Sequence, residues 1–288
     1  MHPLSLPPQP LLPFPTAQDY EQTVLQWARE VDPVHLRARD LSYGPDTQHR
    51  YDVFGAEGMR DAPVLVFWHG GGWTNGYKEY AHFMAEAIVR RGFLFITPTY
   101  RLAPGHRLPA AFDDAVRLLA ELHRTVGQWG GDRQNLYLAG HSAGGGIAAM
   151  AALRRDALDQ AGVPPDAVRA CLPISGVMDL HHPCPQPGSL EERVYTTLLE
   201  HPSHDSLMSA ISWTTGNRVP MLSSYGERDS SRVISANTRM HELLKRQPAP
   251  ARLKEWKGLD HFDTHKVLAD PAHEWYEDLE ALFAQTRR

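Results

Sequence analysis

Short runs of apolar residues alternate along the chain with longer stretches in which apolar positions recur every three or four residues. The short runs are typical of β-strands, and the longer period is typical of amphipathic helices. We expect eight strands, which begin near Arg37, His49, Ala62, Phe93, Asn135, Val168, Val219 and Ala251. We expect helices over residues 80–91, 110–126, 145–156, 233–246 and 273–286. This alternation predicts an α/β fold, a mostly parallel sheet of about eight strands with helices on both faces.

The pattern within the strands predicts their places in the sheet. The first two strands alternate apolar and polar positions, whereas "VLVFW" from Val64 and "LFI" from Leu94 are continuously apolar. Continuous apolar strands are typical of the centre of a parallel sheet. We therefore expect the first two strands to form an antiparallel edge.

Two segments lie outside the alternation. Residues 1–36 begin with a proline-rich leader and continue into an amphipathic stretch, which we expect to form a cap helix over one end of the sheet. Residues 178–218 contain the helix-like "LEERVYTTLLE" before the strands resume. We interpret 178–218 as a small cap-like insertion within a domain of residues 37–288.

Composition excludes several classes of function. The chain has 288 residues, a formal net charge of -5 and no cluster of lysines and arginines that would follow a phosphate backbone. No apolar run approaches the roughly 20 residues that cross a bilayer, and the leader lacks the basic residues of a signal peptide. We therefore expect neither nucleic acid nor a membrane as partner, and a cytoplasmic location. Cys171 and Cys184 are expected to be reduced thiols.

A serine lies between glycines at the junction of a predicted strand and a predicted helix. The segment "GHSAG", from Gly140 to Gly144, fits the G-x-S-x-G pattern of a nucleophile elbow centred on Ser142. The turn leaves little room near the nucleophile, so that residues without a Cβ are needed on either side. The motif alone is weak evidence, because Ser142 could instead only cap the following helix.

A glycine run strengthens the catalytic interpretation. "HGGGW" follows the strand from Ala62, and its backbone N–H groups can stabilise the negative charge that develops on a carbonyl oxygen. We predict Gly71, Gly72 and Ala143 as oxyanion donors, and we expect His69 to hold the loop in place. The alternative is a flexible glycine turn.

The two remaining members of a catalytic triad follow later strands. Serine needs a base to remove its proton, and the base needs a carboxylate to fix its tautomer. Asp229 follows the strand from Val219, and His261 follows the last strand, which gives the order serine, acid, histidine. Glu227 and His265 are the competing candidates for acid and base.

The lining of the substrate pocket is less strongly indicated. Trp73, Tyr77 and His141 flank the oxyanion loop or the nucleophile and are expected to line the pocket, with loop packing as the alternative for the two aromatic residues. The histidines of "DLHHP" and "EHPSHD" lack a convincing metal-ligand spacing. We therefore expect no metal and no other cofactor.

These motifs resemble those of the α/β-hydrolase superfamily of serine hydrolases. "HGGGW", "TYRLAPGHRLPAAFDDA" and "GHSAGG" are similar to the bacterial carboxylesterases related to hormone-sensitive lipase, whereas "ISGVMDL" and "GLDHFD" are similar to kynurenine formamidases. The acid segment "GERDSS" departs from the esterase pattern D-P-L-x-D, and Gly72 departs from the aromatic residue of many formamidases.

The resemblance implies acyl-enzyme chemistry on a small soluble substrate. Our main hypothesis is a carboxylesterase, and the alternative is an arylformamidase that acts on N-formyl-kynurenine or a related aryl formamide with the same triad. A non-catalytic binding protein of the same fold and a lipase acting at an oil interface are weaker alternatives. The sequence does not indicate the oligomeric state.

Overall fold

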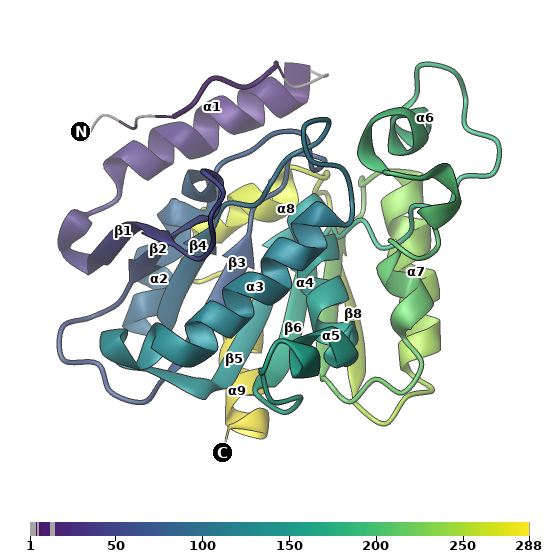
Figure 1. Cartoon of the computed structure of the whole chain (residues 1–288). Helices are drawn as coiled ribbons and strands as arrows, with labels where there is room; N and C mark the ends of the chain where they lie inside the picture. Colours follow the sequence, from purple (N-terminus) through teal and green to yellow (C-terminus); the bar gives the residue numbers. More distant parts are fainter. Residues whose placement is uncertain (1–3, 5, 12–14, 288) are drawn as a thin grey trace.

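An eight-stranded sheet runs through the middle of the computed structural model, which describes residues 4, 6–11 and 15–287 (Figure 1). The strands are β1 (Leu36–Ser42), β2 (Arg50–Phe54), β3 (Ala62–Trp68), β4 (Leu94–Pro98), β5 (Gly131–His141), β6 (Val168–Ile174), β7 (Met221–Gly226) and β8 (Ala251–Trp256). Their order across the sheet is β1-β2-β4-β3-β5-β6-β7-β8. β2 pairs antiparallel with both β1 and β4, and all other neighbours are parallel. The predicted fold class and its antiparallel edge are confirmed.

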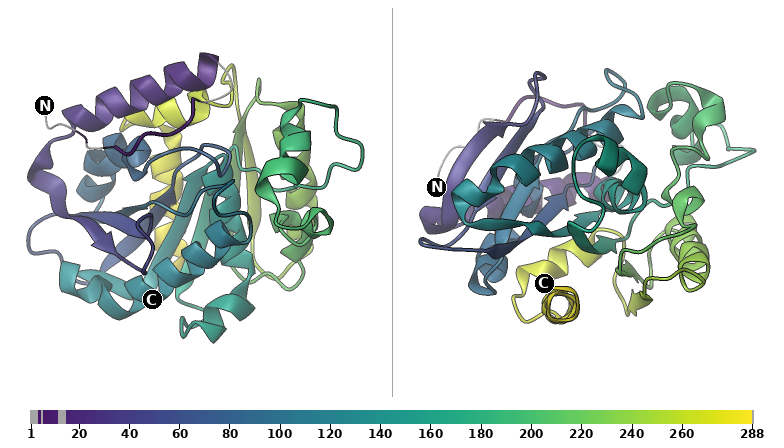
Figure 2. Two further views of the ribbon diagram at one scale, coloured as in Figure 1. Left: turned by 45° about the horizontal axis from the view of Figure 1, so that its top comes forward. Right: turned by 60° about the horizontal axis from the view of Figure 1, so that its bottom comes forward.

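Helices cover both faces of this sheet. They are α1 (Pro15–Glu30), α2 (Ala85–Arg90), α3 (Ala110–Thr125), α4 (Ala143–Leu153), α5 (Arg155–Gln160), α6 (Leu190–Arg193), α7 (Ser231–Leu244), α8 (Asp263–Lys266) and α9 (Glu274–Thr286). Figure 2 shows α9 on the opposite side of the sheet from α3 and α4.

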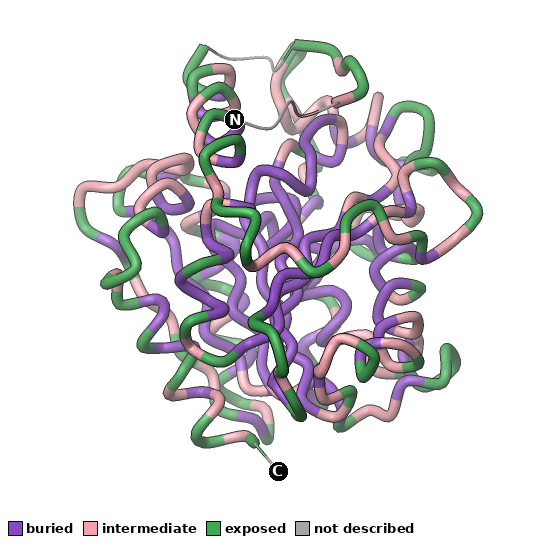
Figure 3. The backbone as a smooth tube through the Cα atoms, turned by 90° about the vertical axis from the view of Figure 1, so that its left-hand side faces the viewer, coloured by how far each residue is buried: buried purple, intermediate pink, exposed green. Residues whose placement is uncertain are grey.

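The central strands are apolar throughout because both of their faces are buried. Val64 and Val66 of β3 belong to the hydrophobic cluster that contains α3 and α4, and Leu65 and Phe67 to the cluster that contains α2 and α9. Successive side chains of a strand point to opposite faces, so neither face can be polar. Figure 3 shows the buried residues gathered in the interior, with exposed residues around them.

The predicted helix over residues 80–91 is only partly correct. The segment Lys78–Met84 is a 3-10 helix, η2, and the α-helix begins at Ala85. A 3-10 helix has three residues per turn, so residues three apart share a face. This spacing brings Glu79 and His82 together towards Asp52 of β2.

Two other predicted helices are interrupted. The stretch predicted over residues 145–156 divides at Arg154, where ψ is 60°, so that α4 ends and α5 begins. The helix-like stretch of the cap is α6 followed by a π-helix, η4, over Val194–Leu198. The amphipathic pattern thus located these segments but not the breaks within them.

The amphipathic stretch near the N-terminus forms α1. Figure 1 shows α1 lying along the edge of the sheet at which the carboxyl ends of the parallel strands lie. Tyr20, Val24 and Leu25 of α1 pack with Tyr77 and Tyr80. Residues 4 and 6–11 of the proline-rich leader form neither helix nor strand, and its other positions lie outside the described residues. The division into residues 1–36 and 37–288 stays a prediction.

None of the helices within residues 4, 6–11 and 15–287 has the length and apolar character needed to cross a membrane. The predicted cytoplasmic location stays a prediction. Cys171 is buried on β6 and Cys184 is exposed, and both are free thiols. Burial raises the pKa of the Cys171 thiol.

Candidate active site

Ser142 occupies a sharp turn between β5 and α4. Its φ of 56° and ψ of -119° are strained for a residue with a side chain. The turn brings the following backbone very close to β3, because a Cβ on Gly144 would lie 2.1 Å from the carbonyl oxygen of Trp68. Only glycine is possible at position 144, which explains the second glycine of the motif.

The structure brings Ser142, His261 and Asp229 together in one hydrogen-bonded row. His261 Nε2 lies 2.8 Å from Ser142 Oγ, and His261 Nδ1 lies 2.8 Å from Asp229 Oδ1. One ring nitrogen of His261 thus faces the carboxylate and the other faces the serine hydroxyl. This arrangement allows Nδ1–H to donate to the carboxylate while Nε2 accepts the serine proton.

Asp229 is held as a buried carboxylate. Its side chain is 0% exposed, and Oδ1 also accepts a hydrogen bond of 2.8 Å from the N–H of Ser230. Burial opposes its ionisation, but the hydrogen bond and charge of His261 outweigh burial and lower the pKa of Asp229 below its ordinary value. Asp229 can therefore stabilise an imidazolium without taking its proton.

The competing acid and base lie elsewhere. Glu227 is exposed, and its carboxylate accepts the N–H of Gly258 and contacts Lys257. His265 is completely buried, where its Nδ1 accepts the hydroxyl of Tyr20 at 2.7 Å. Burial lowers the pKa of His265 to about 3, so its ring is neutral at physiological pH. Neither residue contacts the serine.

Three backbone N–H groups at the predicted oxyanion positions have no acceptor within the part of the chain that the structure describes. These groups belong to Gly71, Gly72 and Ala143. Ala143 is the first residue of α4, where an N–H has no partner inside its own helix. Gly71 and Gly72 line the same cavity as Ser142.

The loop that carries these glycines is held from two sides. His69 donates Nδ1–H to the carbonyl of Gly70 and stacks on Tyr100, whose hydroxyl donates to the carbonyl of His69. On the other side, the side-chain amide of Gln9 in the leader forms two hydrogen bonds, of 2.9 and 2.7 Å, with the backbone of Gly76. His69 thus has the contacts expected of a residue that holds the loop.

A cavity of about 250 Å³ opens beside Ser142. Its wall comes from α1, the oxyanion loop, the segment that follows β6, the cap and the loops that carry Asp229 and His261. The lining residues are Ala17, Tyr20, Gly71, Gly72, Trp73, Thr74, Tyr80, His141, Ser142, Val177, Leu180, Leu190, Arg193, Val194, Leu198, Ser230, Arg232, His261 and Phe262.

Trp73 and His141 belong to this lining, whereas Tyr77 is not among the lining residues. The ring of Tyr77 packs against Tyr80, and its hydroxyl donates to the carbonyl of Pro7 at 2.7 Å. Tyr77 is directed towards the leader because the chain has turned away from the cavity after Gly76. These contacts fit the alternative interpretation of Tyr77, which is loop packing.

His141 supports His261 as well as lining the cavity. Its Nε2–H donates to the backbone carbonyl of His261 at 2.7 Å, and its ring stacks on His265. Burial, with the neighbouring His261 and His265, lowers the pKa of His141 well below its ordinary value. A neutral His141 adds no positive charge beside His261.

Sequence reasoning missed the lining residues outside the motifs. Tyr20 lies on the apolar face of the predicted cap helix, and Phe262 directly follows His261, so both had a signal in the sequence. Arg193 and Arg232 had none, because a charged residue in a helical stretch usually faces water. Arg193 reaches the wall from α6 and Arg232 from the first turn of α7.

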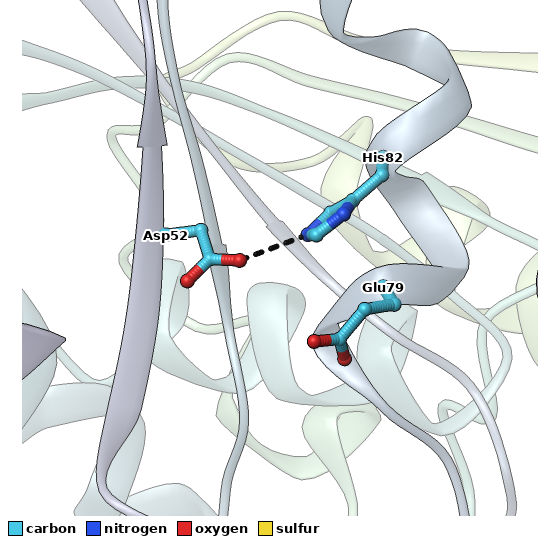
Figure 4. Close-up of side chains that lie close together, drawn as sticks. All are labelled: Asp52, Glu79 and His82. Atoms are coloured by element: carbon cyan, nitrogen blue, oxygen red, sulfur yellow. Dashed lines mark ion pairs between the residues drawn. The ribbon is translucent and has the colours of Figure 1, made fainter. Parts of the chain in front are cut away.

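One cluster of potential metal ligands occurs among the described residues, and it lies away from the cavity lining. Asp52, Glu79 and His82 point towards one another from β2 and η2 (Figure 4). The ammonium group of Lys78 lies among them, 3.0 Å from Asp52 and 2.6 Å from Glu79. Burial opposes the charge of Lys78, but these carboxylates raise its pKa above its ordinary value. A protein cation therefore balances the acids where a metal ion would lie.

Comparison with known proteins places this geometry in context. A family model described as alpha/beta hydrolase fold matches residues 65–263. A probable isoprenylcysteine alpha-carbonyl methylesterase of Oryza sativa is 27% identical over 81% of this chain and 59% of its own length. Esterase LipC of Mycobacterium tuberculosis is 31% identical over 68% of this chain and 52% of its own length. The chain thus spans little more than half of these curated relatives.

Solved structures share the fold at low sequence identity. An esterase from Pyrobaculum calidifontis superposes with a TM-score of 0.74 at 22% identity, covering 94% of this chain and 90% of its own. The metagenomic carboxylesterase EstE1 superposes with a TM-score of 0.74 at 20% identity, covering 93% of this chain and 94% of its own.

Proposed function

Since this chain belongs to the α/β-hydrolase-fold family, we propose that it is a serine hydrolase that cleaves carboxylic esters of small molecules. The observation that carries the proposal is the row of Ser142, His261 and Asp229, with 2.8 Å at both hydrogen bonds, at the wall of a cavity. A serine bonded to a base that is itself bonded to a buried carboxylate is the arrangement that activates a nucleophile.

Each residue has a defined role in the proposed reaction. His261 Nε2 takes the proton of Ser142, whose Oγ attacks the carbonyl carbon of the ester. The N–H groups of Gly71, Gly72 and Ala143 then donate to the oxyanion of the tetrahedral intermediate. His261 gives its proton to the departing alcohol, and the acyl group stays on Ser142. Water, deprotonated by His261, releases the acid and regenerates the serine.

The relatives support an ester as substrate. The names of both curated relatives describe esterases, and both structural neighbours are described as an esterase or a carboxylesterase. The cavity wall is mainly apolar, with Trp73, Val177 and Leu180 among its residues, and this suits the carbon chain of an ester.

The test is a comparison of kcat/KM for 4-nitrophenyl acetate, 4-nitrophenyl butyrate and N-formyl-kynurenine, with a Ser142→Ala variant as the blank. We expect Ser142-dependent turnover of the esters and labelling of Ser142 by a fluorophosphonate probe. Preference for the formyl amide by about a hundredfold, or about 2.7 kcal/mol of transition-state binding, would replace the ester proposal by an arylformamidase. Equal labelling of wild type and Ser142→Ala would contradict the proposed nucleophile.

A further inference from the structure

The charge of the cavity wall is unbalanced. Two arginines, Arg193 and Arg232, line the cavity, and none of the lining residues in the described part of the chain is an aspartate or a glutamate. The chain as a whole has a formal net charge of -5, so a cationic cavity does not follow from its composition. The excess of positive charge is therefore a local property of the residues that line the cavity.

Arg193 extends from the cap among apolar neighbours. Leu190, Val194 and Leu198 share its face of the α6 and η4 segment and also line the cavity. Within residues 4, 6–11 and 15–287, no ion pair or side-chain hydrogen bond engages the Arg193 guanidinium. Placing a cation against apolar groups is costly unless an anion or hydrogen-bond acceptor meets it.

Other arginines of this region have partners. Arg107 donates to the carbonyls of Leu199 and Thr196, and Arg239 lies 2.8 Å from Asp179. The fold thus satisfies arginines that support the cap. Arg193, which faces the cavity, is the exception among these three.

Arg232 adds a second, weakly balanced cation. It lies in the first turn of α7, and its Nε is 3.7 Å from Glu191 of α6, too far for a direct hydrogen bond. Burial lowers the pKa of Arg232, although Glu191 and Asp229 oppose this shift. Asp229 is already bonded to His261, so neither carboxylate fully compensates Arg232.

We propose that the cavity selects substrates that carry a carboxylate on either the acyl or the alcohol part, with Arg193 as its main binding group and Arg232 as a second. This rests on the proposed ester hydrolysis and specifies its substrate class. The planar guanidinium offers two parallel N–H donors that match a carboxylate, and the apolar wall accommodates the intervening carbon chain.

The experiment uses substrates that differ only by the carboxylate. The first pair is mono-4-nitrophenyl adipate and 4-nitrophenyl hexanoate, because a six-carbon chain avoids rapid internal attack by the carboxylate. The second pair is the butyryl esters of 4-hydroxybenzoate and 4-hydroxybenzamide, which moves the charge to the leaving group. Each kcat/KM is divided by the rate of alkaline hydrolysis of the same ester.

The wild-type protein should prefer the anionic member of at least one pair by tenfold or more. Arg193→Gln should lower kcat/KM for that ester by roughly 10- to 100-fold, mainly through KM. It should leave kcat/KM for the neutral ester within about twofold of the wild-type value. For the anionic ester, kcat/KM of Arg193→Lys should lie between the values of the wild type and Arg193→Gln, because lysine keeps the charge but not the paired donors. Turnover of the neutral ester shows that each variant is folded.

Arg239→Gln is the matched control, since Arg239 lies on α7 but outside the cavity lining. It should leave the preference unchanged. The inference is overturned if wild type shows no preference for the anionic ester in either pair, or if Arg193→Gln slows both members of a pair equally. It is also overturned if Arg239→Gln reduces the preference for the anionic ester as strongly as Arg193→Gln does. Failure of the proposed function looks different, because no ester would then be turned over in a Ser142-dependent way.

Discussion

Buried aspartates contact histidines at several places in the described part of the chain, and of the Asp229 and Asp52 pairs only the first is arranged for catalysis. Asp229 lies 2.8 Å from His261, and Asp52 lies 3.2 Å from His82. The aspartate side chains are both 0% exposed. The carboxylate and its imidazole are therefore not what distinguishes the two sites.

The surroundings of the two histidines are different. The side chain of His261 is 23% exposed, and its second nitrogen reaches Ser142 at the cavity wall. The side chain of His82 is 3% exposed, and its aspartate is shared with the Lys78 ammonium. An aspartate and histidine pair becomes a catalytic base when its other nitrogen meets a nucleophile and a substrate can enter. The Asp52 pair, balanced by a lysine, is suited to stabilising the fold.

The largest expected effect follows removal of the proposed nucleophile. Ser142→Ala should lower kcat/KM for 4-nitrophenyl butyrate by at least about 10⁴-fold, because the residual rate comes only from binding and the oxyanion donors. Thermal unfolding should change little, since the variant removes one hydroxyl. Ser203→Ala, at an exposed cap position, is the control and should retain full activity. Substantial activity in Ser142→Ala would move the chemistry away from this site.

The next effect tests the comparison directly, by making the same substitution in both pairs. Asp229→Asn should lower kcat by about 10³- to 10⁴-fold with a small change in KM, because an amide favours the wrong tautomer of His261. Asp52→Asn should change kcat by less than about threefold and act on stability instead. Steady-state kinetics and urea unfolding of both variants separate the two roles. A comparable loss of kcat in both variants would mean that the sites are coupled.

The sequence predicted much of the triad region because its constraints are local. Gly144 is required by a 2.1 Å approach to Trp68, and Asp229 and His261 follow β7 and β8, two strands that the sequence pattern located. The carboxyl ends of parallel strands lie at one edge of the sheet, so residues distant in sequence meet there. The antiparallel edge could be predicted from the alternation of apolar and polar positions in the first two strands.

The remainder depended on contacts between distant segments. Tyr77 could not be excluded from the pocket from its sequence position, because its orientation depends on Pro7 in the leader. Arg193 lines the cavity only because the cap turns α6 towards Ser142. The Lys78 cluster combines residues of β1, β2 and η2, and no spacing in the sequence indicates it.

Removing the lysine should turn the stabilising pair into a source of instability. Lys78→Met leaves Asp52 and Glu79 close together without their cation, at an expected cost of about 3 to 5 kcal/mol in the free energy of unfolding. Urea unfolding near neutral pH measures this cost. Lys78→Met combined with Glu79→Gln should recover part of it, because one of the two carboxylates is then neutral. No loss in the single variant would show that the acids are balanced in another way.

The smallest effect concerns a third histidine, His265, which is only four residues from His261 but is completely buried. Burial lowers the pKa of His265 to about 3, whereas histidine in an unfolded chain titrates near about 6.5. Protons therefore bind the unfolded state first as the pH falls. The contribution of His265 to stability is complete above about pH 6.5 and is lost progressively below it.

His265→Phe should remove this part of the pH dependence while retaining a ring against Phe67, which stacks on His265 with ring centroids 5.1 Å apart. Between about pH 7 and about pH 5.5, the wild-type free energy of unfolding should fall by about 1.2 kcal/mol more than that of the variant. Urea unfolding at both values measures the difference. Phe67→Leu is the control, because it loosens the same stack without changing a titrating group and should cost the same at both values. If the free energy of unfolding of His265→Phe depended on pH as strongly as that of the wild type, His265 would take up protons in the folded protein. Its burial would then not keep the ring neutral.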